Sequence, residues 1–251
     1  MLIYDSHCHA EAINVSDIAS HYINNEVAII PGVDLNSITA LVALRNNYIQ
    51  YKVGFGIHPW YIDANLNHHK QLSRLDTEIS QFKPDFIGEI GLDYLKPHHE
   101  LQKEYFIGQL QLALKYKLPI IMHCVKAYND VLSILKQYIR VDTIQHSKMG
   151  IIHAFNTNAI IAQEFIQLGF LLGIGSLITK TSQISKNIEQ IPITSLVLES
   201  DAPYMSAFGK EKSSSSDCFL YAQIAAKHLN INLIDLINCS NSNVLNLFRC
   251  D

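Results

Sequence analysis

Residues 86–124 read FIGEIGLDYLKPHHELQKEYFIGQLQLALKYKLPIIMHC, and this stretch decides the fold. It begins with a short apolar run at residues 86–90 and ends with another at residues 118–122. Between them, residues 100–116 place apolar side chains on one face of a helix. Short and nearly continuous apolar runs are typical of strands that are buried on both faces. The stretch therefore predicts a strand–helix–strand unit with parallel strands.

The same pattern recurs along the whole chain. Apolar runs occur at residues 2–4, 27–30, 53–57, 86–90, 118–122, 150–152, 170–174 and 196–198. Residues 158–168 form another amphipathic stretch, and two more helical segments follow at residues 219–228 and 233–248. Eight such units predict an α/β fold with one domain over residues 1–251, a (β/α)₈ TIM barrel with extra C-terminal helices. The rival architecture is an open doubly wound sheet, but no GxGxxG motif follows the first run.

Composition limits the functions that the chain can have. Its 251 residues suit one barrel, and 48% hydrophobic residues suffice for a large core. A net charge of −4 argues against a protein that holds a long nucleic acid with its whole surface. The five cysteines include no CxxC pair, and neither a signal peptide nor an apolar membrane span is visible. We therefore expect a cytoplasmic protein with free thiols and no membrane partner.

Polar side chains lie at the ends of six of the predicted strands. These are His7 and His9 after the first run, His58 after the third, Glu89 in the fourth, His123 after the fifth, His153 after the sixth and Asp201 after the eighth. In a (β/α)₈ barrel the carboxyl ends of the strands meet on one face, where active sites are built. We therefore expect these side chains to lie close together.

The residue types at these strand ends predict a metal centre. His7 and His9 are two residues apart on a strand, so both side chains point the same way and can chelate one ion. Burying several imidazoles and two acids together is costly unless a cation compensates. Imidazole and carboxylate suit zinc, manganese, nickel or magnesium. The ligand count predicts two divalent ions, with His7, His9 and Asp201 around one, His123 and His153 around the other, and Glu89 between them.

Six motifs, in order and at the spacing of successive units, resemble those of the TatD family of metal-dependent deoxyribonucleases. They are Asp5-Ser6-His7-Cys8-His9, Gly56-Ile57-His58-Pro59, Gly88-Glu89-Ile90-Gly91-Leu92-Asp93, Leu118-Pro119-Ile120 with His123, His153-Ala154-Phe155, and Leu198-Glu199-Ser200-Asp201-Ala202-Pro203. The resemblance implies a TIM barrel, one or two divalent metals and hydrolysis of phosphodiester bonds in DNA. It also implies metal ligands at His7, His9, Glu89, His123, His153 and Asp201.

The chain departs from this family in two places. The family commonly has an arginine two residues after the histidine of the fifth strand, where this chain has Val125, and the nearest basic residue is Lys126. Many members also carry arginine and asparagine in the loop after the Asp-Ala-Pro motif. The corresponding loop here, residues 204–217, has Lys210 and Lys212 instead. These departures leave the predicted metal site intact but remove expected phosphate contacts.

Particular roles follow for the residues of the site. We expect Glu89 to bridge the ions, and Asp201 either to bind metal and accept a proton from the attacking water or to bind metal alone. His58 either contacts the substrate phosphate or supports the site from behind, unless it only packs beside Pro59. Lys126 either replaces the missing arginine as a phosphate contact or is simply solvated.

Three functions remain open at this point. The first is a phosphodiesterase or nuclease that acts on DNA. The second is a hydrolase of a small-molecule amide, ester or phosphoester bond at the same site. The third is a barrel that binds metal without turnover, which the complete set of ligands opposes. The compact form of the family also suggests a monomer.

Overall fold

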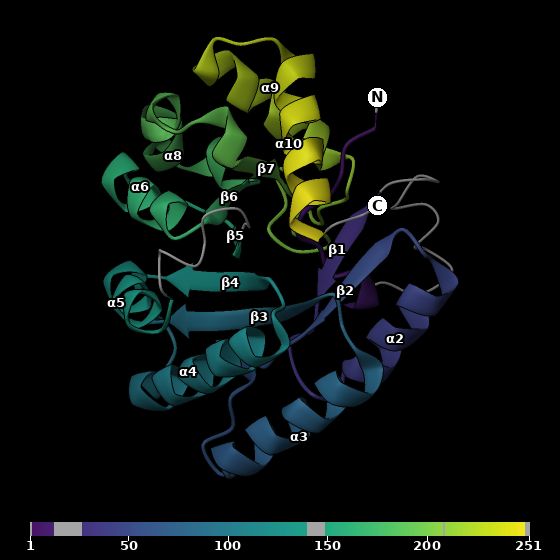
Figure 1. Ribbon diagram of the computed structural model, residues 1–251. Helices are drawn as coiled ribbons and strands as arrows, with labels where there is room; N and C mark the ends of the chain where they lie inside the picture. Colours follow the sequence, from purple (N-terminus) through teal and green to yellow (C-terminus); the bar gives the residue numbers. More distant parts are fainter. Residues whose placement is uncertain (1, 13–26, 140–148, 208, 249–251) are drawn as a thin grey trace.

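The computed structural model describes residues 2–12, 27–139, 149–207 and 209–248 (Figure 1). Its sheet has seven parallel strands in the order in which they follow along the chain. They are β1 (Ala28–Pro31), β2 (Tyr51–Phe55), β3 (Phe86–Asp93), β4 (Ile120–Val125), β5 (Gly150–Ile152), β6 (Phe170–Ile174) and β7 (Leu196–Leu198). Seven of the eight predicted strands are thus confirmed, and their neighbours in sequence are neighbours in the sheet.

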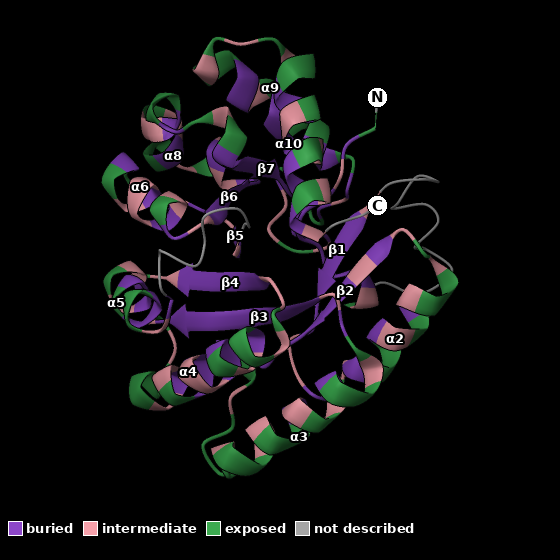
Figure 2. Ribbon diagram, in the orientation of Figure 1, coloured by how far each residue is buried: buried purple, intermediate pink, exposed green. Residues whose placement is uncertain are grey.

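Helices alternate with the strands and lie around the outside of the curled sheet (Figure 1). They are α2 (Ile38–Asn47), α3 (His68–Phe82), α4 (His99–Tyr116), α5 (Tyr128–Tyr138), α6 (Ala159–Gln167), α7 (Leu177–Lys180), α8 (Ser182–Asn187), α9 (Asp217–Leu229) and α10 (Leu233–Phe248). Figure 2 shows buried strands inside and exposed residues on the outer faces of the helices. Over the described ranges, no helix combines the length and the apolar character needed to cross a membrane.

The inner face of the sheet has an apolar layer of its own. Ile29, Phe86, Ile121, Ile151, Leu171 and Val197, one from each of six strands, form a cluster with Val244 and Leu247 of α10. Side chains two residues apart on a strand point to the same face. The layer therefore fills the end of the sheet that α10 contacts, and the following inward positions lie toward the carboxyl ends of the strands.

The prediction of a first strand at residues 2–4 was wrong as to regular structure. Only Asp5 pairs there, in a single parallel bridge with Ala28. Further on, the backbone N–H of Ser6 donates to the carbonyl of Leu198 at 3.0 Å, and that of Cys8 donates to Ile29 at 3.1 Å. The segment alternates between β7 and β1 as hydrogen-bond partners, as a strand between two parallel neighbours does, but Asp5 is the only described residue of the segment in a regular bridge.

Candidate metal centre

Side chains alternate between the two faces of a strand, and this alternation places two histidines on the inner face of the sheet. His123 comes two residues after Ile121 in β4, and His153 two residues after Ile151 of β5, so each follows a residue of the inner apolar layer. Both imidazoles are buried, at 7% and 6% exposure. The periodicity of the strands thus places apolar packing at one end of the sheet and metal-binding chemistry at the other.

The N-terminal segment and the segment that follows β7 meet at the same place. The backbone N–H of Asp201 donates to the carbonyl of His7 at 2.9 Å, and the N–H of His9 donates to Ala202 at 2.7 Å. The buried carboxylate of Asp5 accepts hydrogen bonds from the backbone N–H and the hydroxyl of Ser200. These contacts hold the segment that carries His7 and His9 against the end of β7.

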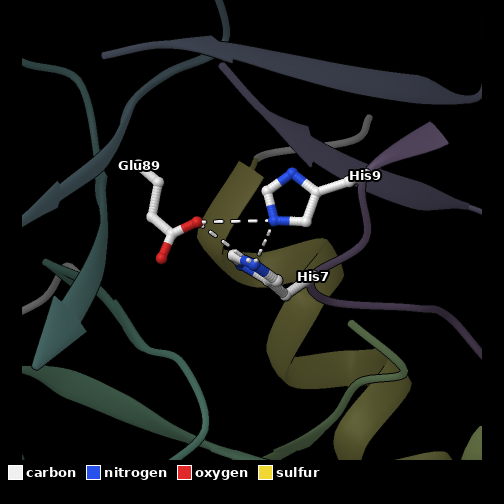
Figure 3. Close-up of side chains that lie close together, drawn as sticks. All are labelled: His7, His9 and Glu89. Carbon is white, nitrogen blue, oxygen red and sulfur yellow. Dashed lines mark hydrogen bonds and ion pairs between the residues drawn. The ribbon is translucent and has the colours of Figure 1, made fainter. Parts of the chain in front are cut away.

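One oxygen of Glu89 faces the first pair of histidines. Figure 3 shows His7 and His9 pointing toward Glu89, which comes from β3 on the opposite side. Nε2 of His7 lies 3.3 Å from Nε2 of His9 and 3.4 Å from Oε2 of Glu89. Oδ1 of Asp201 lies 3.3 Å from Nε2 of His7 and 3.5 Å from Nε2 of His9. Four donor atoms therefore surround one point.

The other oxygen of Glu89 faces the remaining histidines. Oε1 lies 3.1 Å from Nδ1 of His123, 3.3 Å from Nε2 of His58 and 3.5 Å from Nε2 of His153. Glu89 is buried at 2% exposure, so its carboxylate reaches both groups of rings from a fixed position. The two oxygens thus divide the donor atoms into two sets.

The spacing of the first set fits a divalent cation. Four ligand atoms about 2.0–2.1 Å from a tetrahedral centre are about 3.3–3.4 Å apart. Five separations between these four atoms span 3.3–3.5 Å, which is long for charge-assisted hydrogen bonds. Nitrogen and oxygen donors that converge at this spacing suit a shared ion better than direct pairing. Clusters with metal-ligand spacing include His7–His9–Glu89 and His7–His153–Asp201.

Charge in the cluster depends on close coupling between acids and rings. Burial alone would raise the pKa of Glu89, but the neighbouring charges of His58, His153 and His7 hold it well below its usual value. Burial would lower the pKa of His9, but the hydrogen bond and charge of Glu11 raise it to about 9. His153 behaves in the same way, because Glu89 and Glu199 raise its pKa to about 10 against the effect of burial. These neighbouring groups thus keep the carboxylate of Glu89 ionised.

Three carboxylates support ring nitrogens from outside the cluster. Oε1 of Glu11 lies 3.0 Å from Nδ1 of His9, and Oδ2 of Asp93 lies 3.1 Å from Nε2 of His123. Oε1 of Glu199 lies 3.4 Å from Nδ1 of His153. A carboxylate on the far nitrogen fixes the tautomer and orientation of a ligating imidazole. Each of these rings therefore turns its other nitrogen toward the cluster.

The backbone makes room for one of these supports. A Cβ at Gly173 of β6 would come within 2.0 Å of Oε2 of Glu199, so only glycine leaves space for this buried side chain. Glu199 also accepts a hydrogen bond from the backbone N–H of Ala154 at 2.6 Å. These contacts let Glu199 both face the ring of His153 and hold the end of its strand.

Neither Glu11 nor Asp93 was among the site residues predicted from the sequence. Asp93 does accept a hydrogen bond from the N–H of Leu95, but it also contacts His123 and accepts one from Nε1 of Trp60 at 2.5 Å. The signal was present, because Asp93 lies four residues after Glu89 on a strand and so shares its face. Glu11 follows the segment of His7 and His9 and lies in a short 3-10 helix, η1 (Ala10–Ala12). The sequence does not reveal which way this helix turns the Glu11 side chain.

His58 differs from the other rings. It caps the short helix η2 (Pro59–Tyr61), where its Nδ1 accepts the backbone N–H of Trp60 at 3.1 Å. Burial lowers the pKa of His58 to about 4, so the ring is neutral near pH 7. A neutral ring that accepts at Nδ1 carries its hydrogen on Nε2. His58 therefore presents an N–H donor to Oε1 of Glu89, and not a free lone pair.

The basic residues that the sequence singled out lie outside the donor cluster. Lys126 follows β4 and is exposed, and no hydrogen bond or ion pair joins it to another described residue. Lys210 pairs with the buried carboxylate of Asp217 at the start of α9. Val125, at the position of the missing arginine, ends β4 half-buried. Of these two lysines, only Lys126 keeps its charge free of a described partner.

Comparison with known proteins agrees with this architecture. A profile of the family described as "TatD related DNase" matches residues 4–249. The "Uncharacterized metal-dependent hydrolase YjjV" of Escherichia coli K12 is 30% identical over 181 residues, which cover 70% of this chain and 68% of the relative. The "Deoxyribonuclease Tat-D" of Schizosaccharomyces pombe is 28% identical over 190 residues, covering 71% and 60%. The crystal structure of the TatD homologue YjjV superposes with a TM-score of 0.88 at 24% identity, covering 99% and 98%.

Proposed function

Because the chain belongs to the family of TatD related DNases, we propose that it is a two-metal phosphodiesterase that hydrolyses DNA. The observation that carries this proposal is the division of donor atoms by Glu89. Its Oε2 faces His7 and His9, while its Oε1 faces His123 and His153. A carboxylate with a separate set of nitrogen donors on each oxygen suits a bridge between two cations. The name of the S. pombe relative supports DNA as the substrate.

Each residue of the cluster has a place in this proposal. His7, His9 and Asp201 would hold one ion, His123 and His153 would hold the other, and Glu89 would span both. Divalent cations bound there would polarise a phosphoryl group and lower the pKa of a water molecule. The residues themselves supply a buried frame of imidazoles and carboxylates that fixes where the ions, and through them a phosphate, would bind. We also propose that the segment of His7 and His9 closes the barrel between β7 and β1, in line with its hydrogen bonds to both.

Asp201 is positioned to accept a proton from the attacking water. Burial would raise its pKa, but the hydrogen bond with His7 and the charges of His153, His7 and His9 lower it. The carboxylate is therefore ionised near neutral pH, with Oδ1 directed at the cluster. The alternative is that Asp201 only binds metal.

His58 and Lys126 complete the site on the substrate side. We propose that the N–H at Nε2 of His58, which faces Oε1 of Glu89 in the metal-free protein, would donate to a phosphoryl oxygen when substrate binds, because its Nδ1 is already occupied by the backbone of Trp60. Lys126 supplies a positive charge at the end of β4, without the bidentate geometry that an arginine would offer.

The second candidate function is hydrolysis of a small-molecule bond at the same centre. It is favoured by Val125 in place of arginine and by the pairing of Lys210 with Asp217. Bis(p-nitrophenyl) phosphate and p-nitrophenyl acetate separate the two reactions. We expect metal-dependent turnover of the phosphodiester, with two metal ions per chain by elemental analysis. Turnover of the acetate alone would transfer the assignment to the small-molecule hydrolase.

Metal affinity is expected to rise with pH. In the metal-free protein, a pKa of about 9 for His9 and about 10 for His153 means that both rings are protonated at pH 7. An ion can bind their nitrogens only by displacing those protons, so binding releases protons and strengthens as pH rises toward 9. Calorimetric titration with manganese in two buffers of different ionisation enthalpy measures the release. Affinity that does not change between pH 6 and pH 8 would contradict the protonated rings.

Asp93→Asn is expected to weaken metal binding about 10–100-fold, because His123 loses the carboxylate that orients it. The matched control is Asp76→Asn, which removes a carboxylate bound to Lys115 on the surface. Calorimetric metal affinity is the readout, and saturating metal should restore most of the activity. If Asp93→Asn binds metal as tightly as the control, Asp93 does not position His123.

A further inference from the structure

We propose that Trp60, Tyr61 and Tyr204 form a binding site for a nucleobase beside the scissile phosphate, a role that rests on the proposed phosphodiesterase function. These three residues are called the aromatic rim below. Their exposed fractions are 56%, 51% and 51%, although each adjoins a nearly buried cluster. Half-exposed aromatic rings at the edge of a polar site offer free faces on which a flat ligand can stack.

Each ring of the aromatic rim contacts a histidine of the centre. The centroid of Trp60 lies 5.5 Å from that of His58, and that of Tyr61 lies 6.2 Å from the same ring. The centroid of Tyr204 lies 5.4 Å from that of His9. A group bound against these rings would therefore be next to a phosphate held at the centre.

The aromatic rim borders both sets of donor atoms. Trp60 and Tyr61 adjoin His58, which faces Oε1 of Glu89, whereas Tyr204 adjoins His9, which faces Oε2. A nucleotide chain that places its phosphate at Glu89 would thus have an aromatic ring on either side for its bases.

Trp60 is held in place before any ligand arrives. Its indole N–H donates to Asp93, its backbone N–H donates to His58, and it lies in η2. A ring that is already ordered loses little conformational entropy on binding. Nζ of Lys96 lies over the ring of Trp60, 4.2 Å from its centroid, so a positive charge covers part of one face of this ring.

The charge of the chain favours recognition through bases. The net charge is −4, and the loops that carry arginine in many family members have none here. Aromatic side chains bind single-stranded nucleic acid by stacking, because every base has a π-face. The chemistry of the aromatic rim therefore fits unpaired nucleobases better than a small aliphatic ester.

The test uses the single tryptophan of the chain, Trp60, as a fluorescent probe. The ligands are a phosphorothioate-linked thymidine tetramer and an abasic tetramer with the same linkages, each added to the manganese-loaded protein. We expect saturable quenching by the thymidine tetramer. The abasic tetramer should bind at least about tenfold more weakly than the thymidine tetramer. Tyr204→Ala should weaken binding of the thymidine tetramer but not of the abasic one, while Tyr204→Phe should preserve it.

Kinetics with ordinary phosphodiester tetramers separate stacking from support of the metal site. Trp60→Ala should raise KM about tenfold more for the thymidine tetramer than for the abasic tetramer, and Trp60→Phe should retain most of the affinity for the thymidine tetramer. Phe219→Ala, which removes a 40% exposed aromatic of α9, is the matched control. Equal binding and equal KM for the two tetramers would overturn the aromatic rim even if both are cleaved. Cleavage of neither would count against the proposed function, and the quenching would still decide the base site.

Discussion

Glu89→Gln is expected to lower phosphodiester hydrolysis by about 10³-fold or more, which is the largest effect that we foresee. The substitution keeps the shape of the side chain but removes the negative charge on which both sets of donor atoms converge. A neutral amide also presents N–H hydrogens to one set, where a cation would require a lone pair. Bound metal should fall well below two ions per chain, and elemental analysis and initial rates measure the two effects.

The control for this substitution is Glu100→Gln on α4. Glu100 is 85% exposed in its side chain and pairs with Lys103 at the surface, where an ion pair contributes little. We expect unchanged activity and metal content in that variant. Full metal content together with near-normal rates in Glu89→Gln would remove Glu89 from its bridging position and with it the two-metal arrangement.

Asp201→Asn carries the second large effect, a fall in kcat of about 10²–10⁴-fold. The amide can still offer an oxygen to a cation, but it cannot accept the proton of the attacking water. Because the pKa of Asp201 is lowered, its base form persists as pH falls to acidic values, and rates should decline only below that point. In the variant, this acidic limb of the pH–rate profile should disappear.

Metal content decides between the two roles of Asp201. A variant that retains both ions and loses kcat with an altered pH profile supports the role as base. A variant that loses metal and regains activity at high metal concentration supports a ligand role alone. Unchanged activity with full metal content would exclude both. Asp85→Asn, a half-buried carboxylate bound to the backbone of Val53, serves as the matched control.

Much of the fold was predictable because its determinants are local. An apolar strand that is buried on both faces leaves a continuous run in the sequence, as residues 150–152 and 170–174 show. The helix of residues 100–116 was predicted to within one residue of α4 (His99–Tyr116). The first strand was not, because the backbone groups of Leu2 and Tyr4 hydrogen-bond to the side chain of Asn241 in α10, and pairing with β1 begins only at Asp5. Pairing of that kind depends on the tertiary structure and leaves no local pattern.

The candidate site likewise has features that could be predicted from the sequence and features that could not. His123 and His153 could be placed from the sequence because each directly follows a buried strand, and the period of two fixes its face. The support of His123 by Asp93 and Trp60 could not, since it joins β4, the end of β3 and η2, which only the folded chain brings together. The tautomer of His58 likewise depends on one backbone N–H in η2. These contacts determine the tautomer and orientation of each ring, whereas the sequence shows only that the histidines are present.

The most direct test of the account is the release of nucleotides from a short, end-labelled single-stranded DNA. The reaction is run with magnesium, with manganese and with EDTA, and Glu89→Gln serves as the blank. We expect cleavage that requires a divalent metal, stops with EDTA and is absent in the variant, and the product ladder will give its polarity. Intact DNA after incubation with protein that contains two metal ions per chain would contradict the proposed nuclease.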